Sequence, residues 1–383
     1  MIYRDFGNTG IRISVLGFGC MRLPMIQKNG EMAVNDELAV PLLQRAVELG
    51  VNFFDTAWFY CNNDSQRAVG AALRPVRDKV YISTKLPLFL VQKSQDFDDY
   101  LERSLEQMGL DYLDFNHFHG LTYQTWKEKI LPLKLIDRAE NAKAKGLIRH
   151  LSFSFHGDAD KMGELIDTGA FSSILGQYNL VDRRNEEVFT YAKSKGVGTA
   201  VMGPLMGGNL TDGGDAFLER MRSSASSAAE MGLRFVWSHP SVNVALSGMS
   251  SLQQLEENAK YTDKADSIPP EERQNILDRG QALTELNDLY CTGCRYCNVC
   301  PNDIRPDRIF QLYIQHNVWG LDDAVIRHLS NKGPRGPGAD PSLCSECGDC
   351  AARCPQKIDI PAELRRVWPV LQELNSEKIT KLK

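Results

Sequence analysis

The chain has 383 residues, 43% of them hydrophobic, so it can build more than one ordinary domain core. Its 44 Lys and Arg residues against 49 Asp and Glu residues give a net charge of -5 at pH 7, and no basic run is long enough to follow a nucleic-acid backbone. No window approaches about 18 uninterrupted apolar residues, and the N-terminal stretch lacks a secretory signal pattern. We therefore expect a cytoplasmic protein with no nucleic-acid partner and no membrane segment.

Short β-branched or aromatic runs alternate with longer helical patterns from about residue 16 onward, which is typical of a parallel sheet built from βα units. The candidate strands are, in chain order, residues 16–21, 51–54, 80–84, 112–118, 149–154, 173–178, 196–202 and 242–247. A helical segment follows each strand; between Phe97 and Met108, for example, apolar residues recur at spacings of four and three. Eight such pairs predict an α/β fold, a closed (β/α)8 TIM barrel.

Two segments flank this barrel pattern. Residues 3–14 have a turn signal between two short extended pieces and predict a hairpin that closes the barrel floor. After the last barrel helix, near Tyr261, Pro269 and Pro270 can begin a helix but cannot continue one. We therefore expect a barrel domain over residues 1–262 and a second domain, opened by a linker helix, over residues 263–383.

Polar residues follow three of the predicted strands, where the chemistry of a (β/α)8 barrel is found. Asp55 and Tyr60 follow the second strand, Lys85 the third and His119 the fourth. A tyrosine has a pKa of about 10, so acid–base work at neutral pH needs a nearby cation such as Lys85, whose own charge Asp55 can balance. His119 can hydrogen-bond a substrate oxygen. Each residue alone would be an ordinary loop residue, and we interpret His117 as an interior histidine.

The segments FDTAWFY, STKLP and DYLDFNHFHG resemble the tetrad motifs of the aldo-keto reductases, and the similarity runs from about residue 2 to residue 260. The resemblance implies that Tyr60 donates a proton, that Lys85 and Asp55 tune it, and that His119 orients the carbonyl. It also implies that a reduced nicotinamide, NAD(H) or NADP(H), delivers hydride to a small carbonyl compound, or takes it from an alcohol.

The same resemblance implies a nicotinamide site. Ser154 and Gln177 match the residues that hold the carboxamide, although Phe155 stands where the family has Asn. Met202 occupies the position where many members stack a tyrosine on the ring, and its polarizable sulfur can still cover it. The site is expected to include also Gly19, Cys20, Gly203, Pro204 and Leu205.

The segment SGMSSLQQLEENA resembles the family's adenosine-phosphate motif, which begins at Gly248 and in which Glu257 and Asn258 hold the adenine. Members that prefer NADP usually place Arg or Lys between these landmarks, because a dianionic 2'-phosphate calls for a cation. This chain has Ser250, Ser251 and Gln254 there instead. The departure favours NAD(H) and leaves NADP(H) open, since hydroxyl groups and amides at a helix start also bind phosphate.

Eight of the ten cysteines form two motifs near the C-terminus, each followed by proline. In a reducing compartment such closely spaced thiols usually bind metal. The second motif has the C-x2-C-x2-C-x3-C-P spacing of bacterial ferredoxins, and the first is one residue shorter. Zinc is the alternative, but two Cys-Pro motifs favour two 4Fe-4S clusters. Cys20 and Cys61 lie outside the motifs, and we interpret them as small buried residues.

In two-cluster ferredoxins the fourth cysteine of each motif binds the other cluster. The first set is therefore Cys291, Cys294, Cys297 and Cys354, and the second set is Cys344, Cys347, Cys350 and Cys300. Residues 307–329, between the motifs, have helical periodicity and resemble the helical ferredoxin modules of respiratory and anaerobic oxidoreductases. The whole chain resembles the iron-sulfur branch of the aldo-keto reductases, a barrel followed by a small, mostly helical ferredoxin-like domain.

Three functions remain open on these grounds. The first is an NAD(P)-dependent carbonyl reductase or alcohol dehydrogenase whose clusters exchange electrons with a partner such as ferredoxin. A nicotinamide moves two electrons and a cluster one, and no flavin motif is present to convert between them. The second is an electron-transfer protein whose barrel binds a ligand or partner without carbonyl turnover. The third is a reductase with purely structural clusters.

Overall fold

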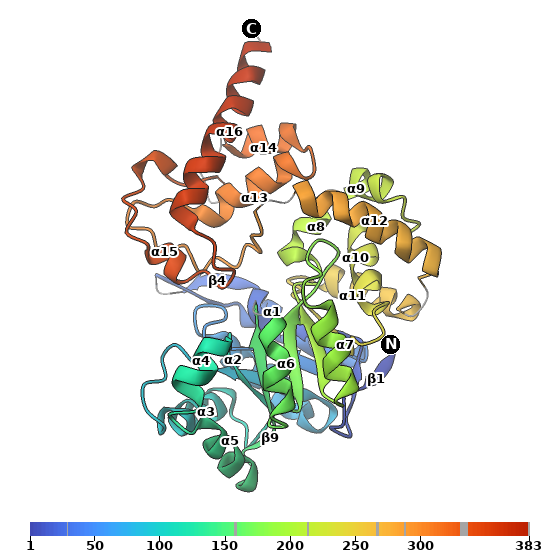
Figure 1. The fold of residues 1–383 in the computed structure, drawn as a ribbon, viewed down its shortest axis with the longest axis vertical. Coiled ribbons are helices and arrows are strands. Elements are labelled where there is room, and N and C mark those ends of the chain that lie inside the picture. The colour runs from blue at the N-terminus through green and yellow to red at the C-terminus, as the bar shows by residue number, and fades with distance from the viewer. Residues whose placement is uncertain are drawn as a thin grey trace. The chain divides into compact units, whose positions relative to one another are not determined.

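The computed structural model describes residues 1–28, 30–156, 159–212, 214–265, 268–286, 289–329 and 336–381. The chain forms two compact units, each discontinuous in sequence (Figure 1). The first consists of Met1–Pro204 and Leu233–Ile268, and the second of Leu205–Gly232 and Pro269–Lys383. The domain boundary between residues 262 and 263 stays a prediction, and the second unit also takes a segment that lies between two barrel strands in the sequence.

The first unit is built on a closed barrel of eight parallel strands. The strands are β3 (Leu16–Gly19), β6 (Phe53–Asp55), β7 (Tyr81–Leu86), β8 (Leu113–Phe118), β9 (Ile148–Phe155), β10 (Ser173–Gln177), β11 (Gly198–Met202) and β12 (Val244–Ser247). Each strand pairs with the next in the chain, and β12 pairs with β3 to close the ring. The predicted TIM barrel is confirmed: five strands lie within the segments expected to form them, and β6, β7 and β9 overlap theirs but extend one or two residues beyond.

Helices follow the barrel strands, and the longer ones bury an apolar stripe against the sheet. They are α1 (Asp36–Glu48), α2 (Ser65–Leu73), α3 (Asp96–Met108), α4 (Tyr123–Thr125), α5 (Leu135–Ala144), α6 (Ala159–Asp167), α7 (Glu186–Ser194), α10 (Ala228–Trp237) and α11 (Leu252–Tyr261). Short 3-10 or π turns span Cys20–Arg22, Arg74–Lys79, Trp126–Ile130 and Thr262–Lys264. Helix α3 buries the predicted stripe and ends at Gly109, whose φ of 62° is left-handed.

The predicted floor hairpin is present as the antiparallel strands β1 (Tyr3–Asp5) and β2 (Arg12–Ser14). Phe6, in its turn, joins Phe53 and Phe115 in one buried cluster, with ring centroids 5.6 and 5.3 Å apart in edge contacts. A Cβ on Gly198 would lie 2.7 Å from the Phe6 ring, so the close approach requires glycine there. The hairpin therefore supplies side chains to the core at this end of the barrel.

A second hairpin, which our sequence analysis missed, precedes α1. Its strands β4 (Met25–Lys28) and β5 (Glu31–Val34) are antiparallel. The Asn-Gly dipeptide at positions 29 and 30 is the signal that could have found it, because two-residue hairpin turns favour that pair. The hairpin matters because it braces the loop that carries Tyr60, as described below.

The second unit is mostly helical in its described residues, as predicted. Its helices are α8 (Asn209–Asp212), α9 (Gly214–Met221), α12 (Pro270–Leu286), α13 (Pro306–Asn317), α14 (Asp322–Leu329), α15 (Asp349–Ala352) and α16 (Ile360–Lys381), with 3-10 turns at Met206–Gly208 and Pro341–Leu343. Helix α12 is the expected linker helix and begins at Pro270. Helix α13 packs against α14 and α16. Among the described residues, no helix combines the length and apolarity needed to cross a bilayer.

Candidate active site and cluster sites

A buried ion pair joins the ends of two neighbouring barrel strands. Lys85 Nζ, on β7, lies 2.5 Å from Oδ2 of Asp55, on β6, and also donates to the carbonyl of Thr56 at 2.8 Å. The Ser83 hydroxyl donates to the other oxygen of Asp55. Both charged side chains are almost fully buried. The carboxylate is therefore held from both sides, and the ammonium has one fixed position.

Tyr60 lies over this ammonium group. Lys85 Nζ is 4.7 Å from the centroid of the Tyr60 ring. Burial lowers the pKa of Lys85 below its usual range, although the charge of Asp55 opposes that effect. A cation at this distance from the ring is close enough to act electrostatically on the Tyr60 side chain.

His119 completes the group. It follows β8, its backbone amide donates to the carbonyl of Leu86 at 3.1 Å, and its ring stands at 86° to Tyr60 with the centroids 6.3 Å apart. Its Nδ1 is buried without a hydrogen-bond partner among the described residues. Burial, and then the charge of Lys85, hold the pKa of His119 well below its usual range. The imidazole is therefore neutral and suited to orient a polar substrate atom.

His117 lies on the same strand but is fully enclosed. Burial lowers its pKa to about 4, so the ring is neutral at physiological pH. This placement agrees with our interpretation of His117 as an interior residue. The structure thus brings together the four residues chosen from the sequence and leaves the fifth in the barrel interior.

The loop after Tyr60 has an unusual backbone. Cys61, Asn62 and Asn63 all have positive φ values, 52°, 57° and 66°. For residues other than glycine this left-handed conformation costs about 1–2 kcal/mol each, so other contacts must hold it. The amide of Ser65 donates to the carbonyl of Tyr60 at 3.2 Å, and the Asn62 side chain donates to the carbonyl of Met32 in β5 at 3.0 Å.

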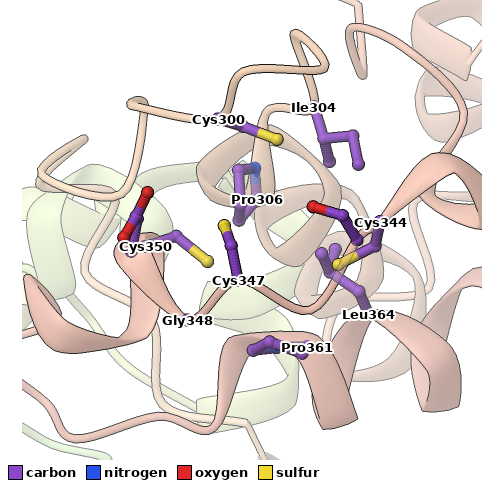
Figure 2. A pocket seen from close by; sticks show the side chains of 11 residues that line it. Cys300, Ile304, Pro306, Cys344, Cys347, Gly348, Cys350, Pro361 and Leu364 are labelled. Carbon is purple, nitrogen blue, oxygen red and sulfur yellow. The ribbon is translucent and has the colours of Figure 1, made fainter.

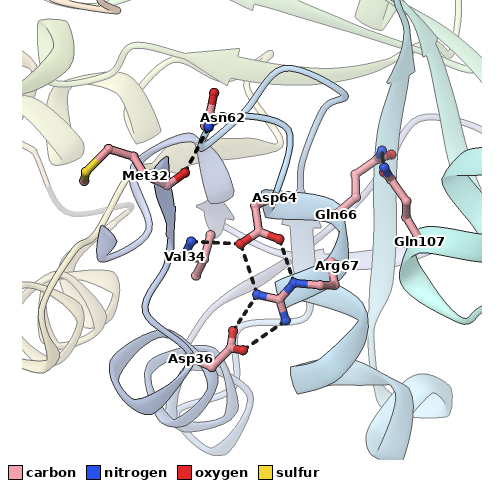
Figure 3. Close-up of polar contacts among 8 residues, drawn as sticks. All are labelled: Met32, Val34, Asp36, Asn62, Asp64, Gln66, Arg67 and Gln107. Carbon is pink, nitrogen blue, oxygen red and sulfur yellow. Dashed lines mark hydrogen bonds and ion pairs between the residues drawn. The ribbon is translucent and has the colours of Figure 1, made fainter. Parts of the chain in front are cut away.

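An Arg67-centred network braces this loop further (Figure 3). Asp64 accepts from the amide of Val34 at 2.8 Å and from Arg67 Nε at 2.6 Å. The other end of the guanidinium binds both oxygens of Asp36 at 2.8 and 3.0 Å. Burial alone would raise the pKa of Asp64, but the hydrogen bonds from Arg67 and Val34 lower it. Sequence reasoning missed this network; the three-residue spacing of Asp64 and Arg67 is the available signal.

The side-chain amide of Gln66 links the strand that carries Lys85 to two helices. It accepts from the Thr84 hydroxyl of β7 at 2.7 Å and donates to Gln107 of α3, also at 2.7 Å (Figure 3). The position of Lys85 is thus supported by a buried polar contact from its chain neighbour.

The expected nicotinamide ligands lie at the ends of adjacent strands. Ser154 on β9 is buried, and its Oγ accepts from the amide of Gly120 at 3.0 Å, which leaves its hydroxyl proton for another acceptor. Gln177 ends β10 and is buried. Gly203 has a φ of +65°, and a Cβ there would lie 2.5 Å from Gln177 Nε2, so only glycine leaves room for this amide. Phe155 is buried and packs against Phe153.

Other expected nicotinamide-site residues lie at the ends of β3 and β11. Met202 ends β11 and is half-buried. Pro204 ends the first of the two segments of the first unit, and Leu205 begins the first segment of the second unit. Gly19 ends β3, beside the carbonyl of Ser247, and the Cys20 thiol is fully buried. Burial raises the pKa of Cys20 well above its usual value, in keeping with an unreactive residue.

The segment expected to bind adenosine phosphate follows β12. Ser251 caps α11 by accepting from the amide of Gln254 at 3.3 Å, and the Gln254 side chain accepts from the amide of Ser250 at 2.8 Å. These two residues therefore satisfy donors that a phosphate would otherwise use. A Cβ on Gly248 would lie 3.3 Å from Cδ of Arg22, a basic residue that sequence reasoning did not consider.

The two expected adenine ligands differ in their surroundings. Asn258 is buried and donates to Ser247 Oγ at 3.1 Å. Glu257 accepts from the Gln253 side chain at 2.9 Å on the exposed face of α11. Asn258 is thus fixed in place, whereas Glu257 stays accessible to a ligand.

Four cysteines from different motifs line one pocket of the second unit. Cys344, Cys347 and Cys350 from the second motif meet Cys300 from the first, and Figure 2 shows their sulfur atoms around a shared space. The empty volume, open mouth included, is about 350 Å³. Apolar neighbours complete the wall: Ile304, Pro306, Pro361 and Leu364. This is the second cysteine set expected from the ferredoxin pattern.

Of the remaining four cysteines, Cys291, Cys297 and Cys354 are buried and Cys294 is half-buried. Burial, with smaller contributions from the neighbouring Cys294, Asp307 and Cys354, raises the pKa of Cys291 to about 12. Cys354 is thus close to a cysteine of the other motif. The amide of Gly293 donates to Cys291 Sγ at 3.4 Å. In the parts of the chain that the structure describes, no three His, Cys, Asp or Glu side chains are grouped to hold a single metal ion.

A segment outside the cysteine motifs also contacts the first cysteine set. The Asn209 side chain, in α8, donates to the carbonyl of Cys291 at 2.9 Å in a buried bond. Asn209 follows Met202 closely in the chain. The segment that follows β11 in the chain therefore provides a side-chain hydrogen bond to the backbone of the first cysteine motif.

Comparisons with known proteins agree with both parts of this description. The aldo/keto reductase family matches residues 15–276, and a 4Fe-4S dicluster domain matches residues 290–358. L-galactose dehydrogenase from Arabidopsis thaliana is 27% identical over 315 residues, which are 74% of this chain and 94% of that protein. Versiconal hemiacetal acetate reductase from Aspergillus parasiticus is 28% identical over 60% of this chain and 78% of its own. The holo form of an aldo-keto reductase from Bacillus halodurans superposes with a TM-score of 0.62 at 26% identity, covering 73% of this chain and 96% of that one.

Proposed function

Because this chain belongs to the aldo/keto reductase family and carries a 4Fe-4S dicluster domain, we propose that it is a cytoplasmic NAD(P)-dependent oxidoreductase that interconverts a small carbonyl compound and its alcohol. The observation that carries the proposal is the buried Lys85–Asp55 pair beneath the Tyr60 ring, with a neutral His119 beside it. This arrangement matches the requirements of a tyrosine acid, because the cation acts on the phenol and the carboxylate keeps the cation in place.

Each residue has one task in the proposed reaction. His119 donates a hydrogen bond to the carbonyl oxygen and holds it near Tyr60. Tyr60 gives its proton to that oxygen in reduction and takes it back in oxidation. A bound nicotinamide supplies the hydride chemistry. Ser154 and Gln177 would hold the carboxamide through the hydroxyl and amide groups that the strand ends present, and Met202 would lie against the nicotinamide.

We propose further that the eight cysteines hold two 4Fe-4S clusters, one in each mixed set. The donors suit the group: four thiols surround one open space in the second set, and thiolates are the ligands that such clusters use. The raised pKa of Cys291 means that metal binding must displace protons from the buried thiols. The clusters supply single-electron transfer, and a ferredoxin-like partner is the proposed external donor or acceptor.

The proposal is tested on protein purified without oxygen. A nucleotide titration followed by a carbonyl screen establishes the reductase, and the same holoenzyme is then offered NADH or reduced ferredoxin while cluster absorption is recorded. Turnover together with cluster reduction by ferredoxin supports electron exchange. Turnover with clusters that neither donor reduces points to a structural role for them. Nucleotide binding without any carbonyl turnover favours the electron-transfer protein instead.

We expect NADH to bind at least as tightly as NADPH. The positions where NADP-preferring members carry cations hold Ser250, Ser251 and Gln254, whose side chains already bond to the start of α11. Direct titration of the holoenzyme with each nucleotide measures this. Arg22→Gln serves as the comparison: a weakening of both nucleotides alike leaves the expectation intact, whereas tight NADPH binding that falls selectively in this variant contradicts it.

Lys85→Met should leave a poor enzyme whose residual alcohol oxidation requires higher pH. The variant removes the cation that lies 4.7 Å from the Tyr60 ring, so the phenol loses its stabilised phenolate form and its pKa returns toward about 10. Oxidation needs the phenolate as base, and the acidic limb of the pH profile of kcat should therefore move upward. An unshifted limb would remove Lys85 from the proton-transfer step. Lys79→Met, on the 3-10 turn before β7, is the matched control and should keep the wild-type profile.

A further inference from the structure

One buried acid of the second unit has no task in the proposed function. Asp307 is the second residue of α13, and its side chain is only 2% exposed. Neither carboxylate oxygen has a hydrogen-bond partner among the described residues. The facing cation is Arg295, whose Nε lies 3.8 Å from Oδ2 and whose side chain is 67% exposed. Burying a carboxylate with so little compensation costs free energy of folding, so a purely structural role does not explain this residue.

Asp307 lies against the first cysteine set. Its ion-pair partner Arg295 stands between Cys294 and Cys297 in the chain, and its carboxylate is near enough to Cys291 and Cys297 to act on both electrostatically. Its backbone amide hydrogen-bonds the Cys297 thiol group. The amide and the carboxylate of one residue thus act in opposite directions on the same group of sulfur atoms. A substitution that changes only the side chain separates them.

The second cysteine set has a different environment. Asp349 is among the residues that line its pocket, but this side chain is exposed, as is that of Cys347. Water screens an exposed charge, and at equal distance the interaction is about four times weaker at a dielectric constant of about 80 than at about 20. The two sets therefore differ in charge and in solvent access: three of four cysteines in the first set are buried, near a buried carboxylate, whereas only Cys350 is buried in the second set and Cys347 is exposed.

We propose that Asp307 lowers the reduction potential of the cluster held by Cys291, Cys294, Cys297 and Cys354, and so makes it the low-potential member of the pair. The inference rests on the proposed cluster assignment. Reduction adds one electron and no proton to this site, and a fixed negative charge at short range disfavours the added electron. At equilibrium the electron therefore resides on the solvent-accessible cluster of Cys300, Cys344, Cys347 and Cys350, where an external redox protein can exchange it.

The test compares two Asp→Asn variants of the intact holoenzyme in redox titrations followed by electron paramagnetic resonance. Asp307→Asn keeps the shape and the backbone amide and removes the charge. It should raise the midpoint potential of the lower-potential cluster, and by more than Asp349→Asn raises that of the other cluster, because the Asp349 side chain is exposed to water. Equal shifts in the two variants, or no shift in Asp307→Asn, would overturn the proposal.

Arg295 gives a second test with the opposite sign. Arg295→Gln removes the cation beside Asp307 and should lower the same midpoint potential, whereas Arg295→Lys keeps the charge and should leave it close to wild type. A potential that moves in the same direction in Asp307→Asn and Arg295→Gln would show a structural disturbance and contradict the proposal. Iron and sulfide assays separate this outcome from a failure of the proposed function: absent clusters refute the assignment itself, while two intact clusters with unmoved potentials refute only the role of Asp307.

Discussion

Replacing Tyr60 with Phe is expected to lower kcat for carbonyl reduction by about 10²- to 10⁴-fold, the usual contribution of a positioned acid. The substitution removes only the hydroxyl group. The ring that lies over Lys85 and beside His119 is retained, so the Lys85–Asp55 pair keeps its packing. Steady-state kinetics in the reductive direction measure the loss, and a direct titration should show nucleotide affinity close to that of the wild type.

The matched control for this prediction is Tyr100→Phe. Tyr100, on α3, packs edge-on against Trp58 with ring centroids 5.1 Å apart and is not part of the tetrad. Loss of its hydroxyl group should leave turnover unchanged. Wild-type turnover in Tyr60→Phe would remove this residue from the mechanism, and equal losses in both variants would point to a disturbed loop instead of a lost proton donor.

Cys354→Ser is expected to disrupt the cluster held by Cys291, Cys294 and Cys297, although its nearest cysteine in the sequence is Cys350. The reason is spatial: the charge of Cys354 acts on Cys291, whereas Cys350 lines the other pocket. Wild-type protein prepared without oxygen should contain about eight iron and eight sulfide ions per chain, and the variant should lose one of two paramagnetic signals.

Two comparisons make this result decisive. Cys61→Ser lies outside both sets and should keep the full iron content. Cys300→Ser should remove the signal that survives in Cys354→Ser, because Cys300 shares the pocket of Cys344, Cys347 and Cys350. Loss of the same signal in Cys354→Ser and Cys350→Ser would show that each motif closes on its own cluster. If the purified protein contains zinc and no sulfide, the metal is structural and the proposed electron transfer is wrong.

The sequence by itself determined the barrel and most of the candidate site. Strand and helix periods are local properties, so all eight strands could be found from runs of a few residues. Residues that end parallel strands must meet at one mouth of a barrel, and this is why Asp55, Lys85 and His119 could be grouped before any distance was known. The spacing of the cysteines likewise predicted two mixed sets, and the pocket that contains Cys300 and Cys350 has the expected composition.

Only the tertiary structure decided what surrounds these residues. The backbone after Tyr60 is held by a network that includes Asp36 and Arg67, which are 31 positions apart in the chain. The hairpin of β4 and β5 contacts this loop, and its turn dipeptide is the one sequence signal we identify for it. From the sequence alone, Asp307 is an ordinary acidic residue in the first turn of a helix. The burial of its side chain, and the lack of a hydrogen-bond partner for its carboxylate among the described residues, depend on segments that meet only after folding, because side-chain solvation is set by whatever packs against it and not by its neighbours in the chain.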